Sequence, residues 1–211
     1  MWPAHRDVIL ITDSAASALP IEDAIDASLR GGIRAVQLRE KNLDGKSLLE
    51  LAHRARGMTK ERGASLIINS RIDVAMAVGA DGVHLGARSI SIVDARRIVG
   101  SEILIGYSAH SPQEARDAAE AGADYVFISP IYPTRKPYDV KPLGAAAVKE
   151  TARLARIPVY ALGGVNESNA AEVMAAGATG VAVISAILSS DDPESASREL
   201  LRAIRAAHRR S

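Results

Sequence analysis

The chain has 211 residues, of which 47% are hydrophobic and only 3% aromatic, so we expect a core of Ala, Val, Ile and Leu. The formal net charge of +1 gives no whole-protein field for nucleic acid or a membrane surface, and we expect neither as a partner. Cysteine is absent, which excludes disulfides, thiolate metal sites and a cysteine nucleophile. This composition is compatible with a reducing cytoplasm, where we expect the protein.

Eight short apolar segments with strand character follow one another along the chain. Residues 8–13 form the first, which resembles a strand more than a signal peptide. Four others belong to a recurring phrase that begins with glycine and leads into Val-rich residues, and the remainder lie between these phrases. In chain order, strands two to eight are expected within residues 31–38, 65–69, 79–86, 103–108, 122–129, 158–164 and 177–185. The glycine that opens each phrase suits the end of a preceding helix, where a positive φ is needed.

Helical patterns fill the gaps between the strands, for example residues 112–121 and 167–176. Regular alternation of strand and helix predicts parallel strands with right-handed crossovers. Eight such units, with no linker and no GxGxxG turn after the first strand, predict a single-domain (β/α)₈ TIM barrel over residues 1–211.

The carboxyl ends of the strands form the working face of such a barrel, so the residues that follow each strand are the candidates for function. After the second strand, Gln37, Arg39 and Lys41 alternate in "QLREK", which places all three on one side of a strand that faces the mouth. Two cations among short polar residues suit a phosphate or diphosphate. The alternative is a salt-bridged rim, with Glu40 and Asp44 as the local partners.

The last two strands carry a second signal for phosphate. Gly163 and Gly164 end the seventh strand, and a helix is expected to start beyond them, with Asn166 or Ser168 as its N-cap. Ser185, after the eighth strand in "VISAI", completes a phosphate cradle of the kind that these two loops form in many barrels. The alternative is that the two glycines only make the turn.

A long, Pro-rich loop at residues 129–144 suggests a lid, in which Arg135, Lys136 and Lys141 close over an anionic ligand. A solvated basic loop is the competing interpretation. His84 and His110 are candidates for proton transfer, and each is equally compatible with a structural role.

The motifs "VQLREK", "LIINSRIDVAMAVGADGVHLG", "YSAHSPQEA", "GADYVFISPIYPT", "ALGGV" and "GVAVISAI" resemble, in order and spacing, the family of thiamine phosphate synthase and the thiazole tautomerase TenI. The resemblance runs nearly end to end. It implies a barrel that binds thiazole phosphate and, in one branch, an aminopyrimidine diphosphate as well. The implied ligand-binding residues are Gln37, Arg39, Lys41, Asn69, Ser108, Thr134, Lys136, Gly164 and Ser185. We also expect Ser70, Gly163 and Ile184 to contact the ligand.

Two departures from the synthase pattern concern the metal. Synthases carry aspartates at the positions of Ser70 and Ser89, and these hold the magnesium that neutralises the leaving diphosphate. Serine supplies no charge there, so we expect no metal site and no cofactor, with Mg²⁺ needed only if the protein is a synthase. The synthase motif Thr-x-Thr-Lys is also altered, to Thr134-Arg135-Lys136.

The favoured hypothesis is therefore a TenI-like isomerase that binds thiazole phosphate and moves a proton on a thiazole carboxylate phosphate without metal. Tautomerases place a histidine where this chain has Pro130, so His110, His84 or Lys136 would have to move the proton. The alternatives are a synthase with rearranged metal ligands such as Asp13 or Asp81, and a non-catalytic thiazole-phosphate-binding regulator. An epimerase of phosphosugars ranks last, because paired carboxylates are missing from the mouth. Whether the chain forms a homo-oligomer stays open.

Overall fold

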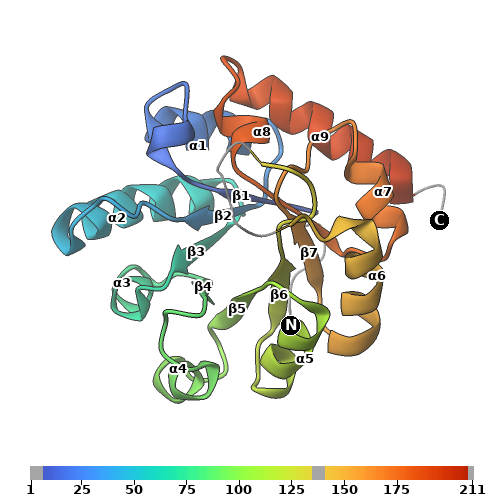
Figure 1. Ribbon diagram of the computed structural model, residues 1–211. Helices are drawn as coiled ribbons and strands as arrows, with labels where there is room; N and C mark the ends of the chain where they lie inside the picture. Colours follow the sequence, from blue (N-terminus) through green and yellow to red (C-terminus); the bar gives the residue numbers. More distant parts are fainter. Residues whose placement is uncertain (1–6, 135–140, 209–211) are drawn as a thin grey trace.

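Eight strands of four to six residues, all parallel, form a closed barrel in the computed structural model, which describes residues 7–134 and 141–208 (Figure 1). Each strand pairs with its neighbours in the chain, and β1 pairs with β8 to close the ring. The strands are β1 Val8–Ile11, β2 Ala35–Leu38, β3 Ser65–Asn69, β4 Gly82–Leu85, β5 Leu104–Ala109, β6 Tyr125–Ile128, β7 Val159–Leu162 and β8 Gly180–Val183. The predicted (β/α)₈ barrel is confirmed.

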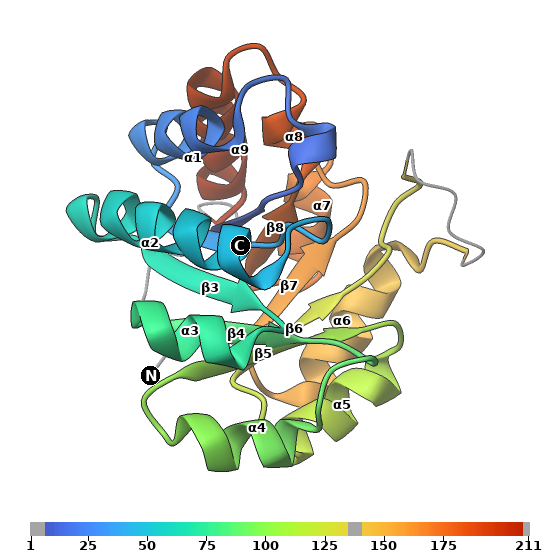
Figure 2. The ribbon, with the colours of Figure 1, turned by 90° about the vertical axis from the view of Figure 1, so that its left-hand side faces the viewer.

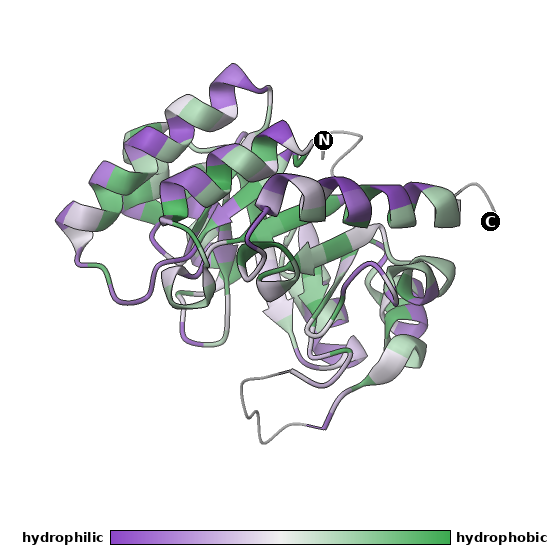
Figure 3. Ribbon diagram, turned by 90° about the horizontal axis from the view of Figure 1, so that it is seen from above, coloured by the Kyte–Doolittle hydropathy of each residue, from purple (hydrophilic) through white to green (hydrophobic). Residues whose placement is uncertain are grey.

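Helices surround the barrel (Figure 1), and hydrophilic and hydrophobic residues alternate along them (Figure 3). They are η1 Ser14–Ala16, α1 Ile21–Arg30, α2 Gly45–Glu61, α3 Ile72–Val78, α4 Ile92–Val99, α5 Pro112–Glu120, α6 Gly144–Ala155, α7 Ala170–Ala175, α8 Ser185–Leu188 and α9 Pro193–His208. The strand arrows run toward the end of the barrel at which α8 begins, directly after β8 (Figure 2). That end is the mouth. No helix within the described ranges is both long and apolar enough to cross a bilayer.

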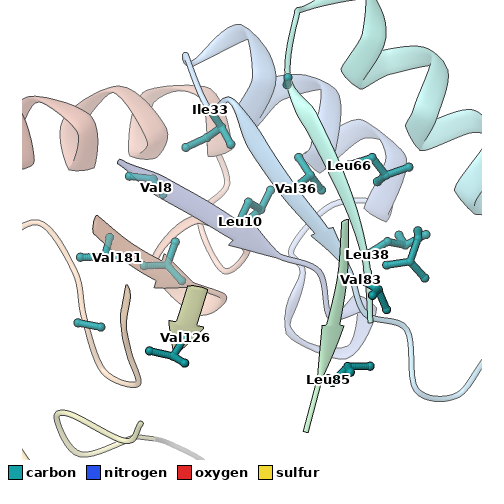
Figure 4. Close-up of a cluster of buried hydrophobic side chains, with 14 of the residues drawn as sticks. Val8, Leu10, Ile33, Val36, Leu38, Leu66, Val83, Leu85, Val126 and Val181 are labelled. Atoms are coloured by element: carbon teal, nitrogen blue, oxygen red, sulfur yellow. The ribbon is translucent and has the colours of Figure 1, made fainter. Parts of the chain in front are cut away.

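Alternate residues of each strand face outward and pack against the helices. Apart from Tyr107 on β5, these outward side chains are aliphatic, and Figure 4 shows part of the resulting layer, including Leu10, Val36 and Leu66. This layer is the Ala, Val, Ile and Leu core that the composition predicts. Because the strands are short and buried on both faces, their sequences read as continuous apolar runs.

The interior of the barrel is different, because three of the few aromatic side chains gather there. Tyr125, Phe127 and Tyr160 are each at most 1% exposed, and their ring centroids lie 5.5 to 6.1 Å apart. Glycine makes room for these rings: a Cβ on Gly106 would lie 2.1 Å from the Tyr125 ring, and one on Gly180 would lie 2.8 Å from the Tyr160 ring. The expectation of a purely aliphatic core is therefore wrong for the interior.

The aspartate of the recurring glycine phrase makes structural contacts at the amino ends of the strands. In two phrases the aspartate accepts a hydrogen bond from the backbone of the preceding strand: Asp81 from Leu66 N–H, and Asp124 from Ile105 N–H at 2.7 Å. Each carboxylate also pairs with a helix arginine, Arg56 or Arg96. In these two phrases the aspartate thus links a helix, the preceding strand and the strand that follows the phrase, at the amino end of the barrel.

We expect Asp124→Ala to lower the free energy of unfolding by about 2 to 3 kcal/mol, because it removes a charged acceptor from a buried strand N–H and a partner from Arg96. Urea unfolding followed by circular dichroism measures the change. Asp117→Ala is the matched control: its ion pair with Arg116 is on the surface, so a loss below about 1 kcal/mol is expected. Equal losses in the two variants would contradict the assigned role.

Candidate functional site

Polar side chains line the mouth where inward-facing strand positions end. Gln37 on β2 donates from Nε2 to Asn69 Oδ1 on β3 at 3.0 Å, and Asn69 donates in turn to Ser70 Oγ at 3.1 Å. Ser70 Oγ lies 3.2 Å from Ser89 Oγ, which accepts from the backbone N–H of Gly86. A continuous network therefore crosses the ends of β2, β3 and β4, and it joins three residues that the sequence predicts for the site.

Gln37 is an unusual member of this network. The side chain is only 1% exposed, and its Oε1 has no hydrogen-bond partner among residues 7–134 and 141–208. A buried amide oxygen without a donor costs free energy that the fold must offset. Gln37 Oε1 is thus an acceptor at the inner end of the mouth that the described residues leave without a donor.

Arg39 is the cation that the structure places beside this network. Its guanidinium is 19% exposed and lies 3.7 Å from the Asp13 carboxylate after β1, and its backbone N–H donates to Thr12 Oγ1. The partner of Arg39 is thus Asp13 and neither of the two residues named in the rim alternative. Glu40 accepts from Ser14 and Asp44 caps α2 through Ser47 N–H.

Lys41 lies outside strand β2. β2 ends at Leu38, and Lys41 is an exposed residue of the turn that leads to α2. Strand alternation therefore places Gln37 and Arg39 in phase, but it does not determine where the Lys41 side chain points.

The hydroxyl pair of Ser70 and Ser89 stands where the resemblance implies a magnesium site. Magnesium prefers an octahedral set of hard oxygen ligands that usually includes a carboxylate. The local donors are hydroxyl and amide groups, and the described residues contain no group of three His, Cys, Asp or Glu side chains that could hold a metal. Of the alternative ligands, Asp13 faces Arg39 and Asp81 lies at the opposite end of the barrel. This donor set does not fit a magnesium ion held by the protein.

Ser70 nevertheless has an uncommon backbone. Its φ of +61° is in the left-handed region, which glycine, asparagine and aspartate tolerate best. The backbone N–H of Ser70 donates to His84 O at 2.9 Å, which fixes the turn after β3. The main chain at this position thus suits an aspartate at least as well as the serine it carries.

His84 is buried inside the barrel, 2% exposed, with both ring nitrogens engaged. Nδ1 lies 3.1 Å from Tyr125 OH and Nε2 lies 2.8 Å from Ser108 Oγ. Burial, with a smaller contribution from the Arg39 charge, lowers the pKa of His84 to about 3, so the ring is neutral. Its hydrogen bond to Ser108 links His84 to the mouth.

His110 is exposed just beyond β5 and is the more accessible of the two predicted acid/base candidates. Its Nδ1–H donates to the Ser129 carbonyl at 2.9 Å, which leaves Nε2 as an acceptor with no partner in the described part of the chain. Lys136 and Arg135 lie outside the described residues, and Thr134 is the half-buried residue that precedes them.

Two glycines of the predicted phosphate cradle are needed for loop packing. Gly163 and Gly164 have φ values of +97° and +68°, and a Cβ on Gly164 would lie 2.6 Å from Pro133 O and 2.8 Å from Tyr132 Cβ. Both glycines are therefore needed for the turn, as the alternative interpretation expects. Gly164 is also exposed, so its backbone remains accessible to a phosphate.

Ser185 opens α8 beside these glycines and is exposed, while Ile184 before it packs against the barrel interior. The first N–H groups of α8 have no carbonyl within the helix to bond, which suits an anion. A helix does start beyond the glycines, but its N-cap is neither Asn166 nor Ser168. α7 begins at Ala170 after Asn169, and Asn166 Oδ1 instead accepts from Ser168 N–H in the preceding turn.

Tyr125 and Gly106 were not predicted as parts of the site. Their signal in the sequence is strand phase: Tyr125 precedes Phe127 by two residues, and Gly106 precedes Ser108 by two, so both pairs face inward. Tyr125 and Gly106 can therefore be predicted from the inward positions along the whole strand, but not from the residues at its exit alone.

Comparison with known proteins gives consistent matches. The family model described as "Thiamine monophosphate synthase" matches residues 8–187. Thiamine-phosphate synthase of Roseiflexus sp. (strain RS-1) is 42% identical over 92% of this chain and 83% of its own length. That of Chloroflexus aurantiacus is 43% identical over 83% and 82%. The structure of thiamine phosphate pyrophosphorylase from Pyrococcus furiosus superposes with a TM-score of 0.90 at 34% identity, covering 96% of each chain.

Proposed function

The chain belongs to the thiamine monophosphate synthase family, and from that membership we propose that it joins an aminopyrimidine diphosphate to a thiazole phosphate, forming thiamine phosphate and releasing pyrophosphate. The relatives and the solved structure carry names for this transfer. Their names support the synthase alternative over the TenI-like isomerase that the sequence hypothesis favoured.

One observation carries the proposal within this chain: the buried Gln37 Oε1 that lacks a donor. An aminopyrimidine brings an exocyclic N–H group to the mouth, and this group would satisfy the orphaned acceptor. A thiazole phosphate alone offers no comparable donor. The mouth is thus suited to a second ligand beside the thiazole.

The transfer breaks the bond between the pyrimidine methylene carbon and the diphosphate oxygen, and the electron pair leaves with pyrophosphate. The lone pair of the thiazole nitrogen forms the new C–N bond. In this proposal Arg39 and Lys41 face the diphosphate and stabilise the charge that grows on it. Gly164, Ser185 and the first turn of α8 hold the thiazole phosphate, so that its nitrogen lies near the methylene carbon.

Because the donor set does not fit a protein-held magnesium, the side-chain cations must supply the positive charge at the leaving group. Arg39 is already partly neutralised by Asp13 at 3.7 Å. We therefore expect a slow synthase compared with one that adds a bound divalent cation.

A second candidate, metal-free isomerisation of a thiazole carboxylate phosphate, is favoured by the uncharged Ser70–Ser89 pair and by the open Nε2 of His110. It needs a phosphate site and one acid/base group, but no pyrimidine. An assay of the purified protein separates the two candidates. Wells with both synthase substrates and Mg²⁺ are read for thiamine phosphate, and wells with the thiazole carboxylate phosphate and EDTA are read for its isomer. Isomer without thiamine phosphate would overturn the first proposal, and silence in both would indicate a binding protein.

We expect Gln37→Leu to lower kcat/KM for the aminopyrimidine diphosphate about 10- to 100-fold, because the acceptor for its amino group is lost. KM for the thiazole phosphate should change little. Ser65→Ala, at the opposite end of the barrel interior, is the matched control and should behave as wild type. Steady-state kinetics with each substrate varied in turn measure both effects. An equal loss for the two substrates would contradict the assignment of Gln37 to the pyrimidine.

A further inference from the structure

Three polar groups inside the barrel form a chain that leads from its sealed centre to the mouth. Tyr125 OH, 0% exposed, lies 3.1 Å from His84 Nδ1, and His84 Nε2 lies 2.8 Å from Ser108 Oγ. Only Ser108, next to last in β5, is partly exposed. The imidazole also stacks on Phe127 with a centroid distance of 4.1 Å, so it has little freedom to turn.

The backbone of β5 is shaped around this chain. A Cβ on Gly106 would lie 2.3 Å from Tyr125 OH and 2.5 Å from His84 Nδ1. No side chain other than hydrogen fits between the phenol, the imidazole and the strand. The contact between Tyr125 and His84 therefore depends on this glycine, and it is too tightly enclosed to be an incidental surface contact.

The direction of the hydrogen bonds follows from the chemistry of the groups. The neutral imidazole carries one N–H, and the bond at one nitrogen decides which nitrogen is protonated. A phenol O–H is a stronger hydrogen-bond donor than a neutral imidazole N–H. Burial raises the pKa of Tyr125 and keeps the phenol protonated, so its O–H donates a hydrogen bond to Nδ1. Nε2 then bears the hydrogen and donates to Ser108 Oγ.

We propose that His84 is a positioning residue, held by Tyr125 as the Nε2–H tautomer, which makes Ser108 a hydrogen-bond donor toward the ligand in the mouth. Because Oγ accepts from His84, the Ser108 hydrogen points away from the ring and into the mouth. The group it recognises is an acceptor, such as a ring nitrogen of the aminopyrimidine. The identity of this ligand rests on the proposed function, whereas the tautomer does not.

Beside the buried Gln37 Oε1, this arrangement gives the mouth one acceptor and one donor at the ends of β2 and β5. An aminopyrimidine presents the complementary pair, an amino donor and a ring-nitrogen acceptor. The relay would thus let the barrel reject heterocycles that present a donor where the pyrimidine presents a nitrogen.

The first test is spectroscopic and needs no substrate. ¹⁵N NMR of the labelled protein at pH 7 should show His84 protonated at Nε2 alone, and the signal is assigned by its loss in His84→Gln. Tyr125→Phe removes the donor to Nδ1 and should shift the signal toward a mixture of tautomers. A wild-type ring protonated at Nδ1, or one unchanged by Tyr125→Phe, would overturn the proposal.

The second test uses coupling between variants. We expect Tyr125→Phe and His84→Leu each to raise KM for the aminopyrimidine diphosphate about tenfold with little change in kcat. His84→Gln keeps an amide N–H toward Ser108 and a carbonyl toward Tyr125, and it should restore most of the affinity. In a Ser108→Ala background, Tyr125→Phe should add no further loss. Additive losses would indicate a merely structural role.

These outcomes separate the two proposals. If the wild-type protein forms no thiamine phosphate, the proposed function fails, and the tautomer measurement still decides the relay. If thiamine phosphate forms but the Nε2–H tautomer is absent, the relay fails alone. Thermal unfolding of each variant shows whether it remains folded, and Tyr125→Phe provides the test if His84→Leu does not fold.

Discussion

Gly106→Ala lowers the free energy of unfolding by about 3 kcal/mol or prevents folding, because the new methyl group has no space inside the barrel. Its Cβ would lie 2.1 Å from Tyr125 Cζ and 2.5 Å from His84 Nδ1. The His84 ring stacks on Phe127 and the Tyr125 ring packs against Tyr160, so neither ring can shift without displacing another. Urea unfolding followed by circular dichroism measures the loss.

Gly86→Ala is the matched control, because Gly86 directly follows β4 and a Cβ there would meet no atom within 4 Å. It should leave the stability within about 0.5 kcal/mol of wild type. Equal stability of the two variants would show that the rings inside the barrel can rearrange, and the proposed relay would then lose its rigid frame.

Replacing Ser70 and Ser89 together with aspartate makes thiamine phosphate formation dependent on Mg²⁺ and raises its rate about 100-fold. The two hydroxyl oxygens are 3.2 Å apart, so two carboxylates there can share one cation. The left-handed backbone of Ser70 accepts aspartate without further strain. The rate is measured with Mg²⁺ and again with EDTA.

Stability provides a readout of this double variant that is independent of turnover. Without a divalent cation the two carboxylates repel each other, so the melting temperature should fall in EDTA and recover with Mg²⁺. The double asparagine variant has a similar shape but no charge, and it should respond to neither condition. If Mg²⁺ does not change the melting temperature of the double aspartate variant, the assignment of these two positions to a lost metal site is contradicted.

Much of the fold follows from local sequence, because all eight strands are short buried runs and four of them follow a glycine phrase at the end of a helix. The inward position of Gln37 and Ser108 follows from the two-residue period of a strand once its phase is known. Neighbouring strands in the chain are neighbours in the barrel, so the exits of β2, β3 and β4 also had to meet. These features need no knowledge of distant contacts.

Other features depend on pairs of residues that the sequence does not connect. No local sequence pattern predicts that Arg39 faces Asp13, or that Tyr125 contacts His84, which is 41 residues away in the chain. The start of α7 at Ala170 was predicted too early, because Asn166 satisfies a turn of its own before the helix begins. Side-chain direction and competition between capping residues are decided by packing, which a pattern of residue types does not contain.

The closure of the ring between β1 and β8 also bears on how folded copies meet one another in concentrated solution. Every strand has a hydrogen-bonded neighbour on both sides, so the sheet offers no free edge on which another chain could add a strand. Aggregation of the native protein by addition of strands to its sheet is thereby prevented. Contacts between native copies must instead be made by helices and loops, where side-chain shape and charge allow selection among neighbours.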